Sequence, residues 1–291
     1  MVAEYTLNGF PLTNNATSAA TNGAYVVIKP GTHILKIRYW VKDVATGTEG
    51  TITKTLSSAT YDQNKYYNIT ANLDVKNYDG DHYYMWDAQQ QYWYGYEWTR
   101  HLSGNTGQPT LNGNSSSNYA QSNSDVSRWY HEGGGSGRFD ATQGCAGLPN
   151  VNEMTWYAAK GEPRWDADEL WTTMGHLYKG GMWFKKKANI SGFNPNTAVD
   201  GNDWRTNGGG RSWFVSQTLL DAADANNYFY LPALGCCGSG QLYSVGDYGY
   251  YWSSSAHPGG SSSAYSLYFY SGYVNVRNGN RSYGFRAEVL Q

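Results

Sequence analysis

Residues 231–289 constrain the fold most, because apolar and polar side chains alternate there with the two-residue period of a β-strand. In residues 265–270, Leu267 and Phe269 fall on one side of an extended chain, and Tyr268 and Tyr270 fall on the other. In residues 273–277 the two valines likewise oppose Tyr, Asn and Arg. The pattern predicts antiparallel strands with one buried face and one tyrosine-rich exposed face.

Turn signals separate these strands. Ser271–Gly272 predicts a turn, and Asn278–Gly279 predicts a type I′ hairpin because both residues tolerate positive φ. A third strand over residues 280–288 would place Arg286 and Glu288 opposite the apolar side chains. The predicted apolar skeleton of the region comprises Leu231, Leu234, Leu242, Val245, Trp252, Leu267, Phe269, Val274, Val276, Phe285 and Val289, with Ala287 beside Phe285.

The residues between these apolar positions are almost all Tyr, Ser, Gly, Asn, Asp, His, Arg or Cys. Tyr, Ser, Gly and Asn also dominate antibody combining loops, where Tyr gives rigid contact area and the small polar residues give adaptable hydrogen bonds. The tyrosines alternatively reflect only the preference of aromatic residues for strands. All of these residue types are reached from an asparagine codon by changing its adenines. The unreachable Gln241, Trp252, Glu288 and Gln291 are therefore predicted to be fixed positions.

Five segments carry a family resemblance: GHLYKGGMWF (175–184), YFYLPA (228–233), GYYWSSS (249–255), AYSLYF (264–269) and SGYVNVRNGNR (271–281). From about residue 150 onward the chain resembles the C-type-lectin-like variable proteins of diversity-generating retroelements, in the FISUMP-type branch of gut bacteria and their phages. In such families an adenine-directed reverse transcriptase rewrites the C-terminal codons, and the protein displays the result as a ligand-binding surface. The resemblance implies a binding protein without catalytic residues, cofactor or metal.

The expected ligand is a variable protein or glycan, bound by the C-terminal face. The predicted contact residues are Cys236, Cys237, Ser239, Tyr243, Asp247, Tyr248, Tyr250, His257, Tyr265, Tyr268, Tyr270, Tyr273, Asn275, Arg277 and Asn280. Trp252, Leu267, Phe269, Val274, Val276 and Phe285 would form a scaffold that faces away from the ligand.

Two other functions remain open. One is a structural fimbrial or adhesin subunit whose tyrosine face a neighbouring subunit covers. The other is an oxidase like the formylglycine-generating enzymes, which share this general fold; these hold copper with two spaced cysteines, whereas Cys236 and Cys237 are adjacent. Cys145 could pair with one of the two, although the simpler interpretation is that both are incidental products of adenine replacement.

The chain of 291 residues is long enough for two domains, predicted as 1–76 and 77–291, with the variable region at 231–291. The formal net charge of −2 gives no reason to expect nucleic acid or an anionic membrane as partner, and no apolar run has membrane-spanning length. A strand-like segment directly after Met1–Val2 predicts an export signal already removed, and hence a cell-surface or extracellular protein anchored to the outer membrane in its precursor.

Residues 1–76 read as a small all-β sandwich that resembles fimbrillin-like or immunoglobulin-like modules, which implies a stalk or tether. The candidate strands are Glu4–Leu7, Ala24–Lys29, His33–Val41, Gly50–Leu56 and Tyr66–Val75. In the second domain, the aromatic segments at 83–87 and 92–98 either bind a sugar beside carboxylates or pack in the core, and the Gly- and Ser-rich stretch after them predicts long loops.

Two helices are predicted over Asn152–Lys160, which ends at Gly161, and over Asp166–Met174, whose acidic first turn suits the helix dipole. Lys185–Lys187 is expected at a solvated strand end, and Asp200–Asp203 has calcium-loop composition without the spacing of an EF-hand. The expected class is α+β: a C-type-lectin-like domain of two helices, antiparallel strands and long loops, preceded by the sandwich.

Overall fold

The computed structural model describes residues 19–78, 83–97 and 115–291. These residues divide into two compact units, one of 19–39 with Ile52–Leu73 and one of Trp40–Thr51 with the described part of Asp74–Gln291. Each unit is considered by itself. The strand predicted at Glu4–Leu7 lies outside the described residues.

The N-terminal unit holds short two-stranded ladders. Strand β1 (Gly31–His33) pairs antiparallel with β4 (Ala59–Tyr61), and α1 (Ala19–Asn22) precedes them. Strands β2 (Lys36–Lys42) and β3 (Glu49–Thr55) form a hairpin through which the boundary between the units passes.

The prediction of strands at Ala24–Lys29 and Tyr66–Val75 is wrong, since both segments are irregular. The alternation of apolar and polar residues in these segments did not produce strands, because no described strand pairs with either one. Their apolar side chains are also uncovered, since Tyr25, Val27 and Tyr66 are 94%, 89% and 89% exposed. Period-two patterning marks a strand only where a partner strand and a covered face exist.

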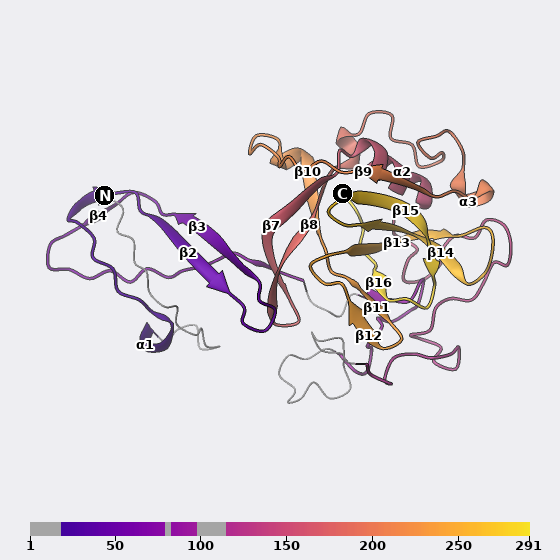
Figure 1. Cartoon of the computed structure of the whole chain (residues 1–291), viewed down its shortest axis with the longest axis horizontal. Helices are drawn as coiled ribbons and strands as arrows, with labels where there is room; N and C mark the ends of the chain where they lie inside the picture. Colours follow the sequence, from indigo (N-terminus) through magenta and orange to yellow (C-terminus); the bar gives the residue numbers. More distant parts are fainter. Residues whose placement is uncertain (1–18, 79–82, 98–114) are drawn as a thin grey trace. The chain divides into compact units, whose positions relative to one another are not determined.

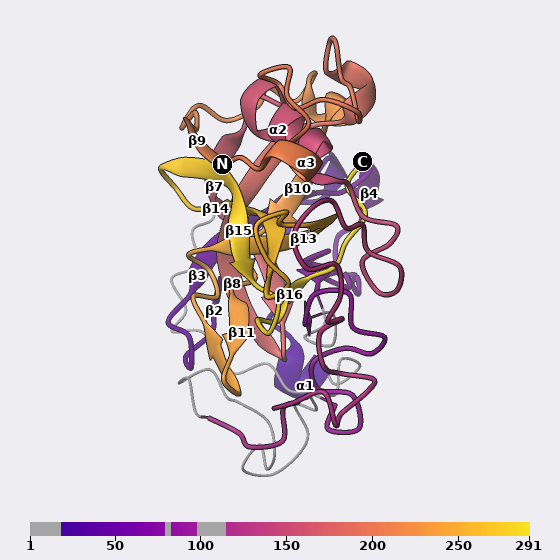
Figure 2. The same cartoon turned by 90° about the vertical axis from the view of Figure 1, so that its right-hand side faces the viewer.

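The C-terminal unit is mostly β-structure with a few short helices (Figures 1 and 2). A six-stranded sheet has the order β6-β16-β13-β14-β15-β9 and a four-stranded sheet the order β10-β8-β7-β5, while β11 and β12 form a separate pair. The bounds are β5 Lys76–Asn77, β6 Tyr83–Tyr84, β7 Arg164–Thr173, β8 His176–Lys185, β9 Arg211–Phe214, β10 Tyr228–Pro232, β11 Cys236–Gly238, β12 Gln241–Tyr243, β13 Gly249–Ala256, β14 Ser263–Phe269, β15 Tyr273–Asn280, β16 Phe285–Arg286, α2 Val151–Lys160 and α3 Trp204–Asn207.

Helix α2 confirms the first helix prediction. Asn150 caps it through a capping box with Glu153, in which each side chain accepts the other residue's backbone N–H. Val151, Met154 and Ala158 are fully buried on its inner face. The helix stops at Gly161, whose N–H donates to the carbonyls of Trp156 and Tyr157.

The second predicted helix is wrong, because residues 164–173 form strand β7. This strand pairs with β8 along its length, and the hairpin turns at Met174–Gly175, both with positive φ (52° and 79°). The acidic residues belong to an irregularity between Asp166 and Leu170: Asp166 Oδ1 accepts the N–H groups of Asp168 and Glu169 at 3.0 Å. Acidic residues are typical both of a helix N-terminus and of a turn that a carboxylate caps, so the sequence alone did not distinguish the two.

The hairpin predicted at Asn278–Gly279 is also wrong. Strand β15 continues through both residues, which pair with Tyr265 and Ala264 of β14. The absent side chain of Gly279 makes room for a ring, since a Cβ there would lie 3.3 Å from Phe285. Of the third strand predicted over residues 280–288, only β16 (Phe285–Arg286) forms as a separate strand. Val289, predicted to be buried, is 66% exposed, and the neighbouring Leu290 is buried instead.

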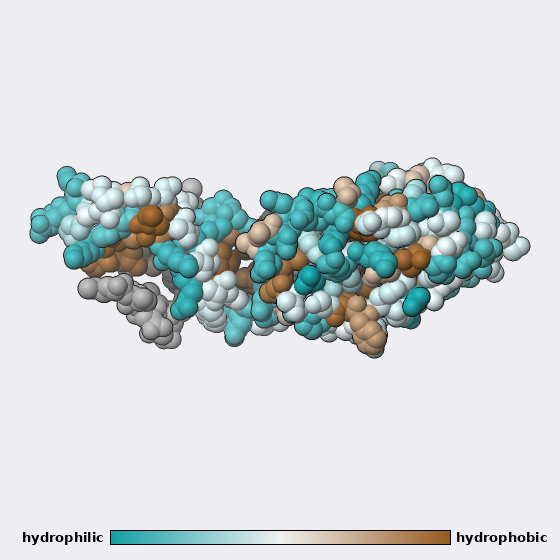
Figure 3. Space-filling view, turned by 90° about the horizontal axis from the view of Figure 1, so that it is seen from above, coloured by the Kyte–Doolittle hydropathy of each residue, from teal (hydrophilic) through white to brown (hydrophobic). Residues whose placement is uncertain are grey.

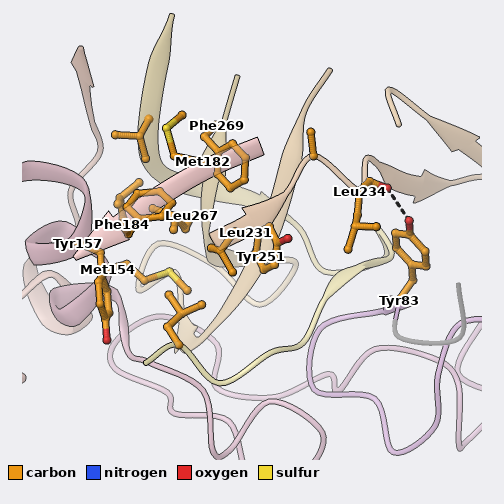
Figure 4. Packing of buried hydrophobic residues seen from close by; sticks show 14 of the residues in the cluster. Tyr83, Met154, Tyr157, Met182, Phe184, Leu231, Leu234, Tyr251, Leu267 and Phe269 are labelled. Carbon is orange, nitrogen blue, oxygen red and sulfur yellow. Dashed lines mark hydrogen bonds between the residues drawn. The ribbon is translucent and has the colours of Figure 1, made fainter. Parts of the chain in front are cut away.

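The main core lies between the two sheets and α2. Figure 4 shows Phe269 and Leu267 beside Met182, Phe184 and Leu231, with Met154 and Tyr157 from α2. The Tyr83 hydroxyl donates to the Leu234 carbonyl at 2.5 Å in the same view.

A second, smaller cluster joins Trp86, Cys145 and Leu148 to Trp252 and Phe285. Together with Tyr83, Met85, Tyr92 and Trp93 in or beside the main core, it confirms core packing for much of the two aromatic segments. All three cysteines are unpaired thiols.

Candidate recognition face of the six-stranded sheet

The strand register places one tyrosine from each of β13, β14 and β15, namely Tyr250, Tyr268 and Tyr273, on one side of the six-stranded sheet. Tyr250 lies opposite Tyr268, which lies opposite Asn275, and Tyr273 lies opposite Phe214 at the edge strand β9. Directly paired residues of an antiparallel ladder point to the same side. The other side carries Tyr251, Leu267, Phe269, Val274 and Val276, each no more than 1% exposed.

The aromatic rings on the outer side contact one another in a continuous series. Tyr250 and Tyr268 have ring centroids 5.0 Å apart, Tyr268 and Tyr270 5.9 Å, Tyr270 and Tyr273 5.8 Å, and Tyr273 and Phe214 4.7 Å. Tyr248 stacks over Tyr268 at 5.8 Å with 10° between the ring planes. We call Tyr248, Tyr250, Tyr268, Tyr270, Tyr273 and Phe214 the tyrosine face; its five tyrosines are half-buried and Phe214 is 80% exposed.

A polar group borders this face. Asn275 is buried and its Oδ1 accepts hydrogen bonds from Arg277 Nη2 at 2.9 Å and from the Ser212 hydroxyl. The Arg277 guanidinium also lies 5.4 Å from the centroid of the Tyr268 ring, a cation–π distance. Arg277 is thus an exposed cation held in place by its neighbours.

The same side of the sheet is covered farther along. Trp252 pairs with Ser266 and therefore points to the same side as Tyr250, yet it is completely buried. Trp86, Cys145 and Leu148 pack over it and over Phe285. The prediction that Trp252 and Phe285 point away from the exposed tyrosines is wrong: they lie on the same side of the sheet as Tyr250, at the part that the chain itself covers.

Three predicted contact residues lie in the interior. Cys237 is 1% exposed, Tyr265 0% and Asn275 2%. The Tyr265 hydroxyl accepts the Gly209 N–H at 2.9 Å, so its polar end is already used. These three side chains are buried and do not form part of the exposed surface.

The remaining predicted residues are accessible but separate from the tyrosine series. Ser239, Tyr243 and Asp247 are exposed on or after the β11–β12 pair, and Asn280 is exposed at the end of β15. Cys236 is half-buried, and burial raises the pKa of its thiol to about 12. His257 packs on Tyr265 at 5.1 Å, and burial lowers its pKa.

Phe214 is the residue that the sequence analysis missed. Phe214 precedes the region of alternating apolar and polar residues and lies in a loop-like stretch, so no local pattern connects it to Tyr273. An exposed aromatic residue in the short segment RSWF was the available signal, but the pairing of β9 with β15 is visible only in the structure.

The calcium-like segment has internal partners. Asp203 caps α3, accepts the Asn152 amide at 2.9 Å and pairs with Arg205 at 2.8 and 2.9 Å, while Asp200 accepts Trp204 Nε1 at 3.0 Å. Hydrogen bonds from Arg205 and Asn152 hold the pKa of Asp203 at about 2, against the effect of burial. Among the described residues, no three His, Cys, Asp or Glu side chains converge as a metal site.

Lys185 ends β8 and its ammonium contacts Glu162, while Lys187 is exposed in a short 3₁₀ helix. Within the described parts of the chain, no helix combines the length and hydrophobicity needed to cross a bilayer. In comparisons with protein-family models, curated proteins and solved structures, no model, protein or structure matches this chain.

Proposed function

We propose that the protein is a binding protein whose tyrosine face recognises a macromolecular ligand. One observation carries the proposal: five half-buried tyrosines and the exposed Phe214 form a connected surface on a sheet whose reverse side buries Tyr251, Leu267, Phe269, Val274 and Val276. Contiguous exposed aromatic surface of this kind commonly marks an interaction site.

The chemistry of the face suits a protein or glycan ligand. Each tyrosine offers a large contact area with few rotatable bonds and a hydroxyl that donates or accepts. Neighbouring rings hold one another, so little side-chain entropy remains to be lost on binding. Arg277 adds a positioned cation beside the rings, where it would act as an anchor.

We propose further that the C-terminal unit is a C-type-lectin-like domain and that its codons are diversified by a retroelement. Support comes from the resemblance of segments within residues 175–184 and 228–281 and from the separation of buried apolar positions from polar outer ones. Such a protein would act at the cell surface or outside the cell, with the N-terminal unit as a tether. A nearby reverse-transcriptase gene, with a near-copy of the 3′ coding end that differs only at adenines, is the expected genomic result.

Two libraries of equal size test the face directly. One randomises the six residues of the tyrosine face among Tyr, Ser, Asn and Asp; the control randomises the six exposed residues 221–226, which lie in a turn and the start of a short 3₁₀ helix. We expect binders to folded protein targets from the face library alone, with melting temperatures within about 5 °C of the parent. Equal enrichment from the loop library, or general unfolding of the face library, would refute the proposal.

A second candidate function is that of an assembly subunit. Several apolar side chains of the N-terminal unit, among them Tyr25, Val27 and Tyr66, are strongly exposed, and hydrophobic surface is visible on this unit in Figure 3. A strand from another copy could cover them. Concentration-dependent oligomers that disappear on changing Tyr25 and Val27 to Ser would favour assembly, whereas a monomer at all concentrations would disfavour it.

A further inference from the structure

A pocket of about 310 Å³ lies against the four-stranded sheet and shares no residue with the tyrosine face. Strands β5, β7, β8 and β10 and the C-terminal residues 288–291 contribute its walls. Its volume is at the lower end of the range for small-molecule pockets, about 300–1,000 Å³.

Aromatic side chains form much of the lining. Trp183 and Tyr230 pack with ring centroids 5.0 Å apart, and Tyr78 meets Trp171 edge-on at 6.1 Å. Both indoles are oriented by hydrogen bonds, Trp183 Nε1 to Asp166 at 3.1 Å and Trp171 Nε1 to the Gly180 carbonyl at 3.0 Å. The rings are therefore fixed before any ligand arrives.

Carboxylates accompany these rings. Glu288 lines the pocket and pairs with Arg286 at 3.0 Å, but Glu169, also in the lining, forms no ion pair with any described residue. Partial burial against the pocket wall and the nearby Asp166 charge raise the pKa of the partly exposed Glu169, as expected for a carboxylate that lacks a cation. The Tyr230 hydroxyl is buried without a hydrogen-bond partner among the described residues.

We propose that this pocket binds a small organic cation, an alkylammonium group seated among Trp183, Tyr230 and Glu169. Aromatic faces attract ammonium groups, and a carboxylate without a partner supplies the charge that such a ligand neutralises. Lys76 also lines the pocket, and its Nζ lies 4.5 Å from the centroid of the Tyr78 ring, so one aromatic ring of the lining already contacts an ammonium group.

Choline and its neutral isostere 3,3-dimethylbutan-1-ol separate charge recognition from simple hydrophobic burial. In titrations of the full chain followed by tryptophan fluorescence and NMR of the indole N–H groups, choline should bind saturably. The isostere should bind at least tenfold more weakly. Equal affinity for the two compounds, or absence of saturable choline binding, would overturn the proposal.

Glu169 and Asp168 provide a matched pair of variants, because both are exposed acids on the same irregular segment of β7 and only Glu169 lines the pocket. We expect Glu169→Gln to weaken choline binding roughly fivefold or more and Asp168→Asn to leave it unchanged. Circular dichroism controls for folding. Equal loss in both variants would show a nonspecific charge effect and refute the site.

Discussion

Trp252 stacks on Phe285 with ring centroids 4.2 Å apart, and this pair marks where one face of the six-stranded sheet passes from covered to open. Tyr250, two residues before Trp252 on the same side, stacks on Phe285 at 4.9 Å and is only half-buried. The small cluster around Trp252 therefore supports the first ring of the tyrosine face. The open tyrosine face and the covered cluster are consecutive parts of one side of the sheet.

Because one part of this sheet face is covered and the other is open, side-chain truncations in the two parts should change the free energy of unfolding by different amounts. Trp252→Ala should lower the free energy of unfolding by about 3–5 kcal/mol, because it opens a cavity among Trp86, Phe285 and Leu148. Tyr270→Ser should change it by less than about 1 kcal/mol, since its ring is partly solvated. Urea denaturation measures both; similar losses would contradict the boundary.

Gly249 is predicted to be required by packing. A Cβ at this position would lie 2.2 Å from Phe269 Cζ, and Phe269 is fully buried in the main core. Gly249→Ala should therefore destabilise the protein by more than about 2 kcal/mol. Gly260→Ala, where no atom lies within 4 Å of the added methyl group, serves as control and should change stability by less than about 0.5 kcal/mol.

Asp87 is predicted to hold the loop that covers Trp252. Its buried carboxylate accepts N–H groups from Thr142 and Gln143 at 2.8 Å and from Cys145 at 3.0 Å, and it contacts His131 Nδ1 at 2.9 Å. Asp87→Ala leaves these donors unsatisfied and should cost about 3 kcal/mol or more.

Hydrogen exchange of residues 142–145 should accelerate in this variant. Asp140→Asn is the control, because Asp140 pairs with Arg138 at a half-exposed surface position. Its effect should stay within about 0.5 kcal/mol. Unchanged protection of residues 142–145 in Asp87→Ala would refute the role of the carboxylate.

Asp203 is predicted to make the free energy of unfolding depend on pH in the acidic range. Its pKa falls from 3.8 to about 2 in the folded protein because Arg205 and Asn152 hydrogen-bond to the charged form. A depressed pKa stabilises the fold above the unfolded value, by on the order of 2 kcal/mol here, and that contribution is lost as the pH falls from about 4 to 2.

The difference in unfolding free energy between the wild type and Asp203→Asn should accordingly be largest above pH 4 and shrink toward pH 2. Asp221→Asn, at an exposed loop position, controls for general charge effects. A difference that stays constant down to pH 2 would contradict the assignment.

The sequence by itself determined the local features whose physical causes are local. Alternation in residues 265–277 correctly separates Leu267, Phe269, Val274 and Val276 from the outward tyrosines, because a strand turns successive side chains to opposite sides. Asn150, the apolar positions of α2 and Gly161 likewise specify one helix, since its caps and its buried face lie within a dozen residues.

Tertiary structure alone decided what covers each side. Trp252 is buried and Tyr250 is not because residues far away in the sequence, around Trp86 and Cys145, pack over only one of them. Most of the segment predicted as a helix, residues 166–173, forms a strand because β8 pairs with it, and Phe214 joins the tyrosine face because β9 pairs with β15. The alternation of apolar and polar residues predicts which side chains share one side of a strand. Which side is buried, and which strands pair, depends on segments that meet only after folding.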